Sequence, residues 1–331
     1  MEAYDLAMLD LDGVVYIGGE AVPGAAQHLA RARERGMRLA FVTNNASRPP
    51  DDVAAHLREL GVEASTDDVV TSAQAAARVL RERYGDMARI ALLGGPGLDA
   101  ALRAEGLEPV AVDDDAAVAV VSGYGPGVLW RDIMRVAVRV KDGLPWVASN
   151  TDLTIPTPFG TAPGHGVLVG VLRDFAGVEP MVAGKPARPL LDETIRRVGG
   201  EHPLMVGDRL DTDIDGAVNT GCDSLLVMTG VTGPAELVAA PAGHRPTYVA
   251  ADLAGLLEAQ GVVEVDGTSA RLGGWTADVG EGAVEVAGQG SADDWWRVVA
   301  ASGWAFLDET GDAADTARLE PPSGRQEKSG G

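Results

Sequence analysis

Short apolar runs alternate with amphipathic stretches along most of this chain. Six runs have the length and composition of buried strands, at residues 6–9, 39–42, 90–93, 118–121, 204–206 and 225–228. Stretches between them place apolar residues at helical spacing, at residues 25–35, 51–60, 73–83 and 189–198. Strands that alternate with helices form parallel sheets joined by helical crossovers, so the pattern predicts the α/β class.

A first polar cluster, Asp10-Leu11-Asp12-Gly13, directly follows the run 6–9. Two carboxylates separated by one residue on a turning backbone can both face a crevice at the end of a strand. One can then act as a nucleophile and the other as a general acid and base, with a divalent cation nearby. The same composition is typical of turns and calcium loops, so this motif alone does not decide the function.

A second cluster, Thr43-Asn44-Asn45, ends the run 39–42. A threonine hydroxyl and the backbone N–H groups after it can bind a phosphoryl oxygen. The alternative is a helix cap or a turn, which these residue types also favour.

The third candidate is Lys185, which lies between Gly184 and Pro186 just before the helical stretch 189–198. Glycine permits close approach of a ligand, and the ammonium group can neutralise oxygens that are being transferred. Most lysines are solvated surface charges. This chain has only three, however, and the position of Lys185 at a helix entrance favours a functional role.

A fourth cluster, from Gly207 to Asp213, follows the run 204–206. Asp208 lies where a carboxylate at the end of a strand can bind Mg²⁺, and Asp213 can fold back towards the same site and orient it. The alternative is an acidic start to the next helix, where these carboxylates only complement the helix dipole.

The four clusters are more informative together than singly. Each follows an apolar strand run, and open α/β sheets bind ligands at the carboxyl ends of their strands. Together they supply a nucleophile, a general acid and base, an oxygen-binding donor, a cation and a metal ligand. That set suits phosphoryl transfer through an aspartyl-phosphate.

The ordered motifs resemble those of the haloacid dehalogenase (HAD) superfamily over about residues 4–258. The resemblance implies a Rossmann-like core in which Asp10 is the nucleophile and Asp12 acts first as acid and then as base. It also implies a Mg²⁺ cofactor bound by the carboxylates of Asp10 and Asp208 and by the backbone carbonyl of Asp12. The remaining implied roles are phosphoryl binding by Thr43, Asn44, Asn45 and Lys185, and orientation of the site by Asp213.

The spacing of the motifs predicts the domain organisation. Asp10 and Thr43 are separated by one turn and one helix, whereas the chain between Thr43 and Lys185 is far longer than one crossover needs. We therefore expect a discontinuous core, 1–80 with 181–260, and an inserted α/β cap at 81–180. This arrangement resembles HAD subfamily IIA, the nitrophenylphosphatase-like and phosphoglycolate-phosphatase-like hydrolases with a large cap of the C2 type.

The resemblance also guides the choice of substrate. A protonatable Asp12 suits hydrolysis of a phosphomonoester, since an alcohol leaving group needs a proton. Large caps favour small phosphorylated metabolites as substrates. The Pro- and Gly-rich segment 153–165 is expected to be a loop over the core site, and His165 at its end is a candidate substrate contact. The nearest type is the actinobacterial phosphatases of glycerol 3-phosphate, in glycerophospholipid metabolism. Phosphoglycolate, pyridoxal phosphate, broad nitrophenyl-phosphate activity and a regulatory protein on the same scaffold remain alternatives.

Composition narrows the partners and the compartment. The 331 residues include 49 acidic and 27 basic ones, and the net charge of −22 argues against a nucleic-acid partner. No apolar run approaches the ~20 residues of a membrane span, and no basic region precedes the first apolar stretch, so no signal peptide is expected. The single cysteine, Cys222, fits a reducing cytoplasm.

The last seventy residues differ from the rest of the chain. Gly-rich, strand-like segments between 262 and 290 precede a helix that begins near Asp293, and four of the six tryptophans lie here. We expect a small β-rich appendage at 262–311, followed by a disordered tail at 312–331. The appendage is a structural buttress, a dimer contact or a metabolite sensor. A homodimer is expected to form through the cap or through this appendage.

Overall fold

The computed structural model describes residue 1, residues 3–157 and residues 160–322, and its contacts divide the chain into two compact units. The first unit comprises residues 1–39 and 200–331, and the second comprises residues 40–199. The predicted division into core, cap and appendage stays a prediction. None of the helices in the described part of the chain combines the length and the hydropathy that a membrane crossing requires.

The first unit contains parallel strands in the order β15-β14-β13-β1. Their bounds are Leu6–Leu9 for β1, Pro203–Gly207 for β13, Asp223–Val227 for β14 and Tyr248–Ala250 for β15. Helices α1 (Ala25–Glu34), α8 (Asp215–Thr220) and α9 (Pro234–Val238) accompany them. A hairpin of β2 (Tyr16–Ile17) and β3 (Glu20–Ala21) follows the turn after β1.

The second unit begins in β4 (Arg38–Thr43), which pairs in parallel with β5 (Val69–Thr71). It also contains a five-stranded parallel sheet in the order β12-β9-β8-β6-β7. Those strands are β6 (Arg89–Leu93), β7 (Glu108–Val110), β8 (Ala119–Ser122), β9 (Trp146–Ala148) and β12 (Met181–Val182). An antiparallel hairpin pairs β10 (Thr154–Thr157) with β11 (Gly160–Pro163).

The helices of the second unit are α2 (Pro50–Glu59), α3 (Ser72–Tyr84), α4 (Pro96–Ala104), α5 (Trp130–Lys141), α6 (His165–Ala176) and α7 (Pro189–Val198). Strands therefore alternate with helices in both units, and the strands of the main sheets run parallel. The predicted α/β class is confirmed. The cause is visible in the burial pattern, since β1 and β8 are buried at every position, as strands covered on both faces must be.

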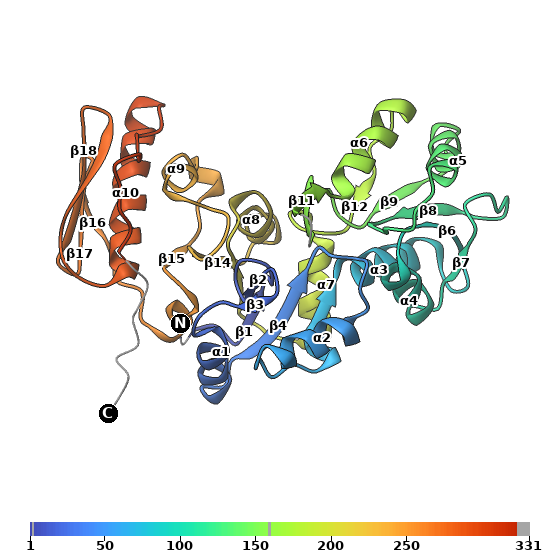
Figure 1. Cartoon of the computed structure of the whole chain (residues 1–331), viewed down its shortest axis with the longest axis horizontal. Helices are drawn as coiled ribbons and strands as arrows, with labels where there is room; N and C mark the ends of the chain where they lie inside the picture. The colour runs from blue at the N-terminus through green and yellow to red at the C-terminus, as the bar shows by residue number, and fades with distance from the viewer. Residues whose placement is uncertain (2, 158–159, 323–331) are drawn as a thin grey trace. The chain divides into compact units, whose positions relative to one another are not determined.

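The C-terminal segment of the first unit folds as the sequence indicates, into an antiparallel sheet and one long helix, α10 (Ala292–Thr310) (Figure 1). The strands are β16 (Glu264–Asp266), β17 (Ser269–Leu272), β18 (Trp275–Gly280) and β19 (Ala283–Gly288). Gly-rich turns connect them, and the predicted secondary structure of this segment, short strands followed by one helix, is confirmed.

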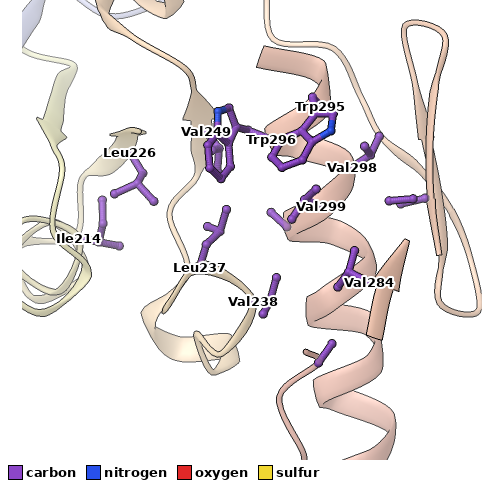
Figure 2. Close-up of a cluster of buried hydrophobic side chains, with 14 residues drawn as sticks. Ile214, Leu226, Leu237, Val238, Val249, Val284, Trp295, Trp296, Val298 and Val299 are labelled. Atoms are coloured by element: carbon purple, nitrogen blue, oxygen red, sulfur yellow. The ribbon is translucent and has the colours of Figure 1, made fainter. Parts of the chain in front are cut away.

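Helix α10 contacts β17 and β18 with one face, and β15 and α9 with another. Figure 2 shows Trp296 and Val299 of this helix close to Leu237 and Val249. The indole of Trp304 adds a hydrogen bond to the Leu237 carbonyl at 2.7 Å. This packing favours the structural role among those considered for the appendage, because clustered tryptophans here bury apolar area within a continuous core.

Part of the predicted disordered tail is packed. Asp315 pairs with the edge strand β19, since its N–H donates to the Gly282 carbonyl at 2.8 Å and its carbonyl accepts from the Val284 N–H at 2.9 Å. Ala314 is buried in the same cluster as α10, and Leu319 packs against it. A short segment after Asp312 therefore covers the edge of the sheet, although its composition is polar. Residues 323–331 of the predicted tail lie outside the described residues.

A buried arginine holds α10 to the end of β15, and its removal is expected to destabilise the protein. Arg297 is 8% exposed; its Nε donates to the Val249 carbonyl at 3.0 Å, and its guanidinium lies 3.6 Å from Asp293. Asp293 in turn accepts from the Ala251 N–H at 2.8 Å. Arg297→Ala leaves these buried polar groups without their partner, which costs about 3–5 kcal/mol. Thermal unfolding should show a clear fall in Tm.

The matched control is Arg271→Ala, an exposed arginine on β17 of the same appendage. Its removal should change the free energy of unfolding by no more than about 0.5 kcal/mol, as is typical of surface substitutions, and should leave Tm close to that of the wild type. Equal stability of the two variants would show that Arg297 does not hold the appendage in place.

Candidate active site

The turn after β1 carries the first candidate carboxylates. The N–H of Asp10 donates to the Val206 carbonyl at 2.8 Å, which extends the pairing of β1 with β13 one residue beyond the strand. The chain then turns, and the N–H of Gly13 donates to the Tyr16 carbonyl at 2.8 Å. Asp10 is half-buried and Asp12 is exposed. The backbone of Asp10 is thus anchored to the sheet and Asp12 is accessible to solvent, while their roles as nucleophile and as acid–base group stay predictions.

Gly13 is required at this turn for two reasons. Its φ of 84° lies in the left-handed region that side chains disfavour. A Cβ at this position would also lie 2.4 Å from the Oδ2 of Asp208. The glycine of the first motif therefore makes room for the carboxylate of the fourth.

Three carboxylates meet at the ends of β1 and β13. Ligand oxygens of Asp10, Asp208 and Asp213 all lie within 4.8 Å of one another, and Asp208 and Asp213 are fully buried. Like charges this close repel one another, and a cation bound among these carboxylates would neutralise them. Hard oxygen donors are the ligands that Mg²⁺ prefers, and the donor set therefore fits this ion.

Asp213 was predicted to orient the site, and its carboxylate lies as close to the other two carboxylates as a metal ligand would. Its Oδ2 accepts from the Arg209 N–H at 3.1 Å, across the turn between β13 and α8. Gly207 gives it space, because a Cβ there would lie 2.3 Å from the same oxygen. The predicted metal-ligand set of Asp10, Asp208 and the Asp12 carbonyl stays a prediction, and Asp213 is a further carboxylate within reach.

The sequence interpretation missed a loop that contacts this cluster. Residues 229–232, between β14 and α9, bring a hydroxyl and two backbone N–H groups to Gly13 and Asp208. The signal was present, since Thr229-Gly230-Val231-Thr232 follows the apolar run 225–228 as the other polar clusters follow theirs. It carries no charged residue, so residue type alone does not mark it as part of a site.

In the second unit, Asn44 connects the predicted phosphoryl-binding residues. Its side-chain amide pairs with the backbone of Lys185 on both sides, donating to the carbonyl at 3.0 Å and accepting from the N–H at 2.9 Å. The same Nδ2 donates to Asp152 at 3.0 Å. Its backbone carbonyl accepts from Ser72 and Asn150, at 2.6 and 2.7 Å. Asn44 therefore fixes the loop after β4 to the segment that carries Lys185.

Thr43 and Lys185 are both buried, at 5% and 2% exposure. The hydroxyl oxygen of Thr43 accepts from the N–H of Asn45 at 3.1 Å, and the Asn45 side chain in turn accepts from Ser47. Gly184 has no room for a Cβ, which would lie 2.5 Å from the Asn44 Oδ1. A lysine this deeply buried is not the solvated surface residue that the alternative interpretation required.

His165 begins α6 and is buried, at 3% exposure. Its Nε2 lies 3.1 Å from the Ser122 hydroxyl, which also accepts from the Trp146 indole at 2.8 Å. Burial lowers the pKa of His165 to about 4, so the ring is neutral near pH 7. These contacts connect β8, β9 and α6. The predicted substrate contact stays a prediction.

Known proteins resemble this chain over most of its length. A family model of haloacid dehalogenase-like hydrolases matches residues 7–108, and a HAD-hydrolase-like model matches residues 182–256. The D-glycerol 3-phosphate phosphatase of Mycobacterium tuberculosis is 43% identical over 293 residues, which cover 88% of this chain and 81% of the relative.

Solved structures agree with this result. The M. tuberculosis glycerol phosphate phosphatase in complex with magnesium matches with a TM-score of 0.83 and 42% identity, over 92% of this chain and 91% of that one. A 4-nitrophenylphosphatase from Thermotoga maritima matches with a TM-score of 0.72 and 30% identity, over 78% and 98%. The chain belongs to the haloacid dehalogenase-like hydrolases. Within that family it is similar to glycerol phosphate and nitrophenyl phosphate phosphatases, and the predicted family resemblance is confirmed.

Proposed function

We propose that this protein is a Mg²⁺-dependent phosphatase that hydrolyses glycerol 3-phosphate to glycerol and phosphate. The observation that carries the chemistry is the group of three carboxylates formed by Asp10, Asp208 and Asp213 beside the Asp10-x-Asp12 turn. The observation that favours the substrate is the 43% identity to a D-glycerol 3-phosphate phosphatase. Phosphoglycolate, pyridoxal phosphate and nitrophenyl phosphate remain the alternative substrates.

In the proposed reaction, a carboxylate oxygen of Asp10 attacks phosphorus and forms an aspartyl-phosphate while the bond from phosphorus to the ester oxygen breaks. Asp12 gives its proton to the departing alkoxide, so glycerol leaves as a neutral alcohol. Asp12, now a carboxylate, accepts a proton from water as that water attacks phosphorus. Phosphate leaves and Asp10 is regenerated. The exposed position of Asp12 suits both proton transfers, because the leaving alcohol and the incoming water reach it.

Asp10, Asp208 and the Asp12 carbonyl would hold Mg²⁺, with Asp213 close by. When bound, the ion would neutralise charge on the phosphoryl oxygens that a protein with a net charge of −22 otherwise repels. Thr43, Asn44, Asn45 and Lys185 are proposed to bind those oxygens as well. The support is the deep burial of Lys185 and its backbone pairing with Asn44.

The test is Mg²⁺-dependent phosphate release from a panel of small phosphomonoesters. It should contain glycerol 3-phosphate in both enantiomers, phosphoglycolate, pyridoxal phosphate, a nucleoside monophosphate and nitrophenyl phosphate. We expect the highest kcat/KM for glycerol 3-phosphate. A preference for another ester would overturn the substrate, and no hydrolysis of any ester would favour a regulatory protein on the same scaffold.

Chelation of the metal is expected to stop turnover reversibly. Without a cation, the charges of Asp10, Asp208 and Asp213 repel an incoming phosphate ester, and activity should fall to background in excess EDTA. Added Mg²⁺ should restore it. Circular dichroism before and after chelation separates loss of the ion from unfolding. Activity that persists in chelator contradicts the metal assignment.

We further propose a cytoplasmic location and a place in glycerophospholipid metabolism. The location is supported by the single cysteine, Cys222, because a chain without a possible internal disulfide suits a reducing compartment. Fractionation of the source cells tests the location.

We also propose that the protein is a homodimer that associates through the outer faces of α5 and α6. Exposed apolar side chains recur along both helices, at Trp130, Met134 and Val138 and at Val167, Val171 and Phe175. The helices are neighbours, since the Lys141 ammonium lies 4.9 Å from the Phe175 ring centroid. A groove that Met134 and Val138 help to line also carries two acidic residues and several arginines, among them Asp113, Asp115, Arg131 and Arg135. A surface that carries both positive and negative charges beside an apolar face can complement the same surface of a second copy.

Sedimentation velocity tests this association. Wild-type protein should sediment as a dimer, and a double variant Val138→Glu, Val171→Glu should sediment as a monomer. Val262→Glu, at a side chain 88% exposed in the other unit, is the matched control and should remain dimeric. A wild-type monomer, or a dimer that survives the double substitution, overturns the proposed surface.

A further inference from the structure

The loop between β14 and α9 contacts two elements of the proposed metal site at once. The Thr229 hydroxyl donates to the Gly13 carbonyl at 2.5 Å, and the Val231 N–H donates to the Asp208 carboxylate at 2.6 Å. The Thr232 N–H donates to the Asp208 backbone carbonyl at 3.1 Å. One loop therefore binds the turn that carries Asp10 and Asp12, and both the main chain and the side chain of Asp208.

Steric contacts add to these hydrogen bonds. A Cβ on Gly230 would lie 2.0 Å from the Oδ2 of Asp208, and a Cβ on Gly13 would lie 2.4 Å from the same atom. The carboxylate is thus enclosed between two glycine backbones. Its rotation is restricted by close packing as well as by the N–H of Val231.

We propose that residues 229–232 form a positioning loop that sets the orientation of the Asp208 carboxylate relative to the Asp10-x-Asp12 turn, and thereby the affinity for Mg²⁺. This proposal rests on the proposed metal-dependent function. Thr229 is its central residue, because its hydroxyl connects the loop to Gly13 while the next residues hold Asp208. Hydrogen-bond partners of metal ligands raise affinity by fixing the ligand in its binding orientation, and their loss costs about 10–100-fold in metal affinity or activity.

The geometry explains why a threonine serves here. Thr229 is half-buried, and its hydroxyl reaches the main-chain carbonyl of Gly13 in the turn after β1. Thr229→Val keeps the β-branched shape and replaces the hydroxyl with a methyl group. Thr229→Ser keeps the hydroxyl and removes only a methyl group. The pair therefore separates the hydrogen bond from the packing.

The experiment measures Mg²⁺ binding by isothermal titration of the metal-free full-length protein, with Mg²⁺ alone and no substrate. We expect Thr229→Val to raise the Kd for Mg²⁺ about 10-fold or more, and Thr229→Ser to restore it to within about 2-fold of wild type. In phosphatase assays, the Mg²⁺ concentration for half-maximal rate should shift by the same factor, while KM for the phosphate ester at saturating Mg²⁺ changes little.

Gly230→Ala provides an independent test, because its Cβ would displace the Asp208 carboxylate. The control is Gly243→Ala, a glycine of the same unit at which a Cβ would meet nothing within 4 Å. We expect weakened Mg²⁺ binding for the first and wild-type binding for the second. If Gly230→Ala fails to fold, the comparison of Thr229→Val with Thr229→Ser still tests the proposal.

Unchanged Mg²⁺ affinity in Thr229→Val overturns the proposal, and so does an equal loss in the valine and serine variants, which would indicate packing alone. Failure of the proposed function looks different. In that case wild-type protein either binds no Mg²⁺ or binds it without hydrolysing any ester, and only the first of these results removes the basis of the positioning loop.

Discussion

Asp10→Asn is expected to abolish phosphate release, with kcat reduced by a factor of about 10⁴ or more, as for other enzymes that lose their nucleophile. The amide is nearly the same shape as the carboxylate, but its oxygen is too weak a nucleophile to attack phosphorus. The backbone of Asp10 is held by the Val206 carbonyl, and this bond does not involve the side chain. The variant should therefore fold, and phosphate release with the preferred ester is the measurement.

The control for this result is Asp211→Asn, which removes one negative charge from the turn after β13. Asp211 is exposed and its carboxylate pairs with Arg209, so it lies outside the group of three carboxylates. We expect near wild-type kcat and KM for this variant and an unchanged Tm for both. Turnover of Asp10→Asn near the wild-type rate would show that another residue is the nucleophile.

Much of the fold was predictable because the signals that carry it are local. The runs that predict β1, β8, β13 and β14 are apolar throughout, and a buried parallel strand requires that pattern. Polar residues placed directly after such runs mark the carboxyl ends of the strands. Asp10 and Asp208 could therefore be placed at one sheet edge from the sequence alone, and the structure brings their carboxylates together.

The contacts that organise those residues could not be predicted in the same way. Thr229 and Gly13 are more than 200 positions apart, and no periodic pattern relates them. The role of Asn44 in binding phosphoryl oxygens stays a prediction, but the bonds of its side-chain amide to the backbone of Lys185 and to Asp152 could not be foreseen. Side-chain-to-backbone bonds of this kind depend on three-dimensional proximity, and residue type alone gives only the capacity to form them.

His165 illustrates a different limit. A histidine between glycines in a Gly- and Pro-rich segment is typical of an accessible loop, whereas the structure buries it beside Ser122 and Trp146. The same limit applies to the segment after Asp312, because its polar composition does not indicate the backbone pairing of Asp315 with β19. Backbone hydrogen bonds are available to any sequence, so composition is a weak guide to where a chain end packs.

Lys185→Met is expected to lower kcat by about 10²–10³, the cost of removing one charge-stabilising group from a transition state. Methionine approximates the length of the lysine stem, so the change removes the ammonium and little of the packing. The anchoring of this residue should survive, because Asn44 binds its main-chain N–H and carbonyl and not its side chain. KM should change much less than kcat, since the charge on the phosphoryl oxygens grows as the bond to the leaving group breaks.

Lys141→Met is the matched control. This lysine is exposed on α5 and contacts the Phe175 ring, so its removal should leave both kcat and KM near wild type. Steady-state kinetics with the preferred ester at saturating Mg²⁺ separates the two parameters. A loss in Lys185→Met that is confined to KM would mean that the ammonium binds the ground state and the transition state equally. In that case the charge neutralisation that accelerates the reaction must come from the metal site, and Lys185 serves only to hold the ester.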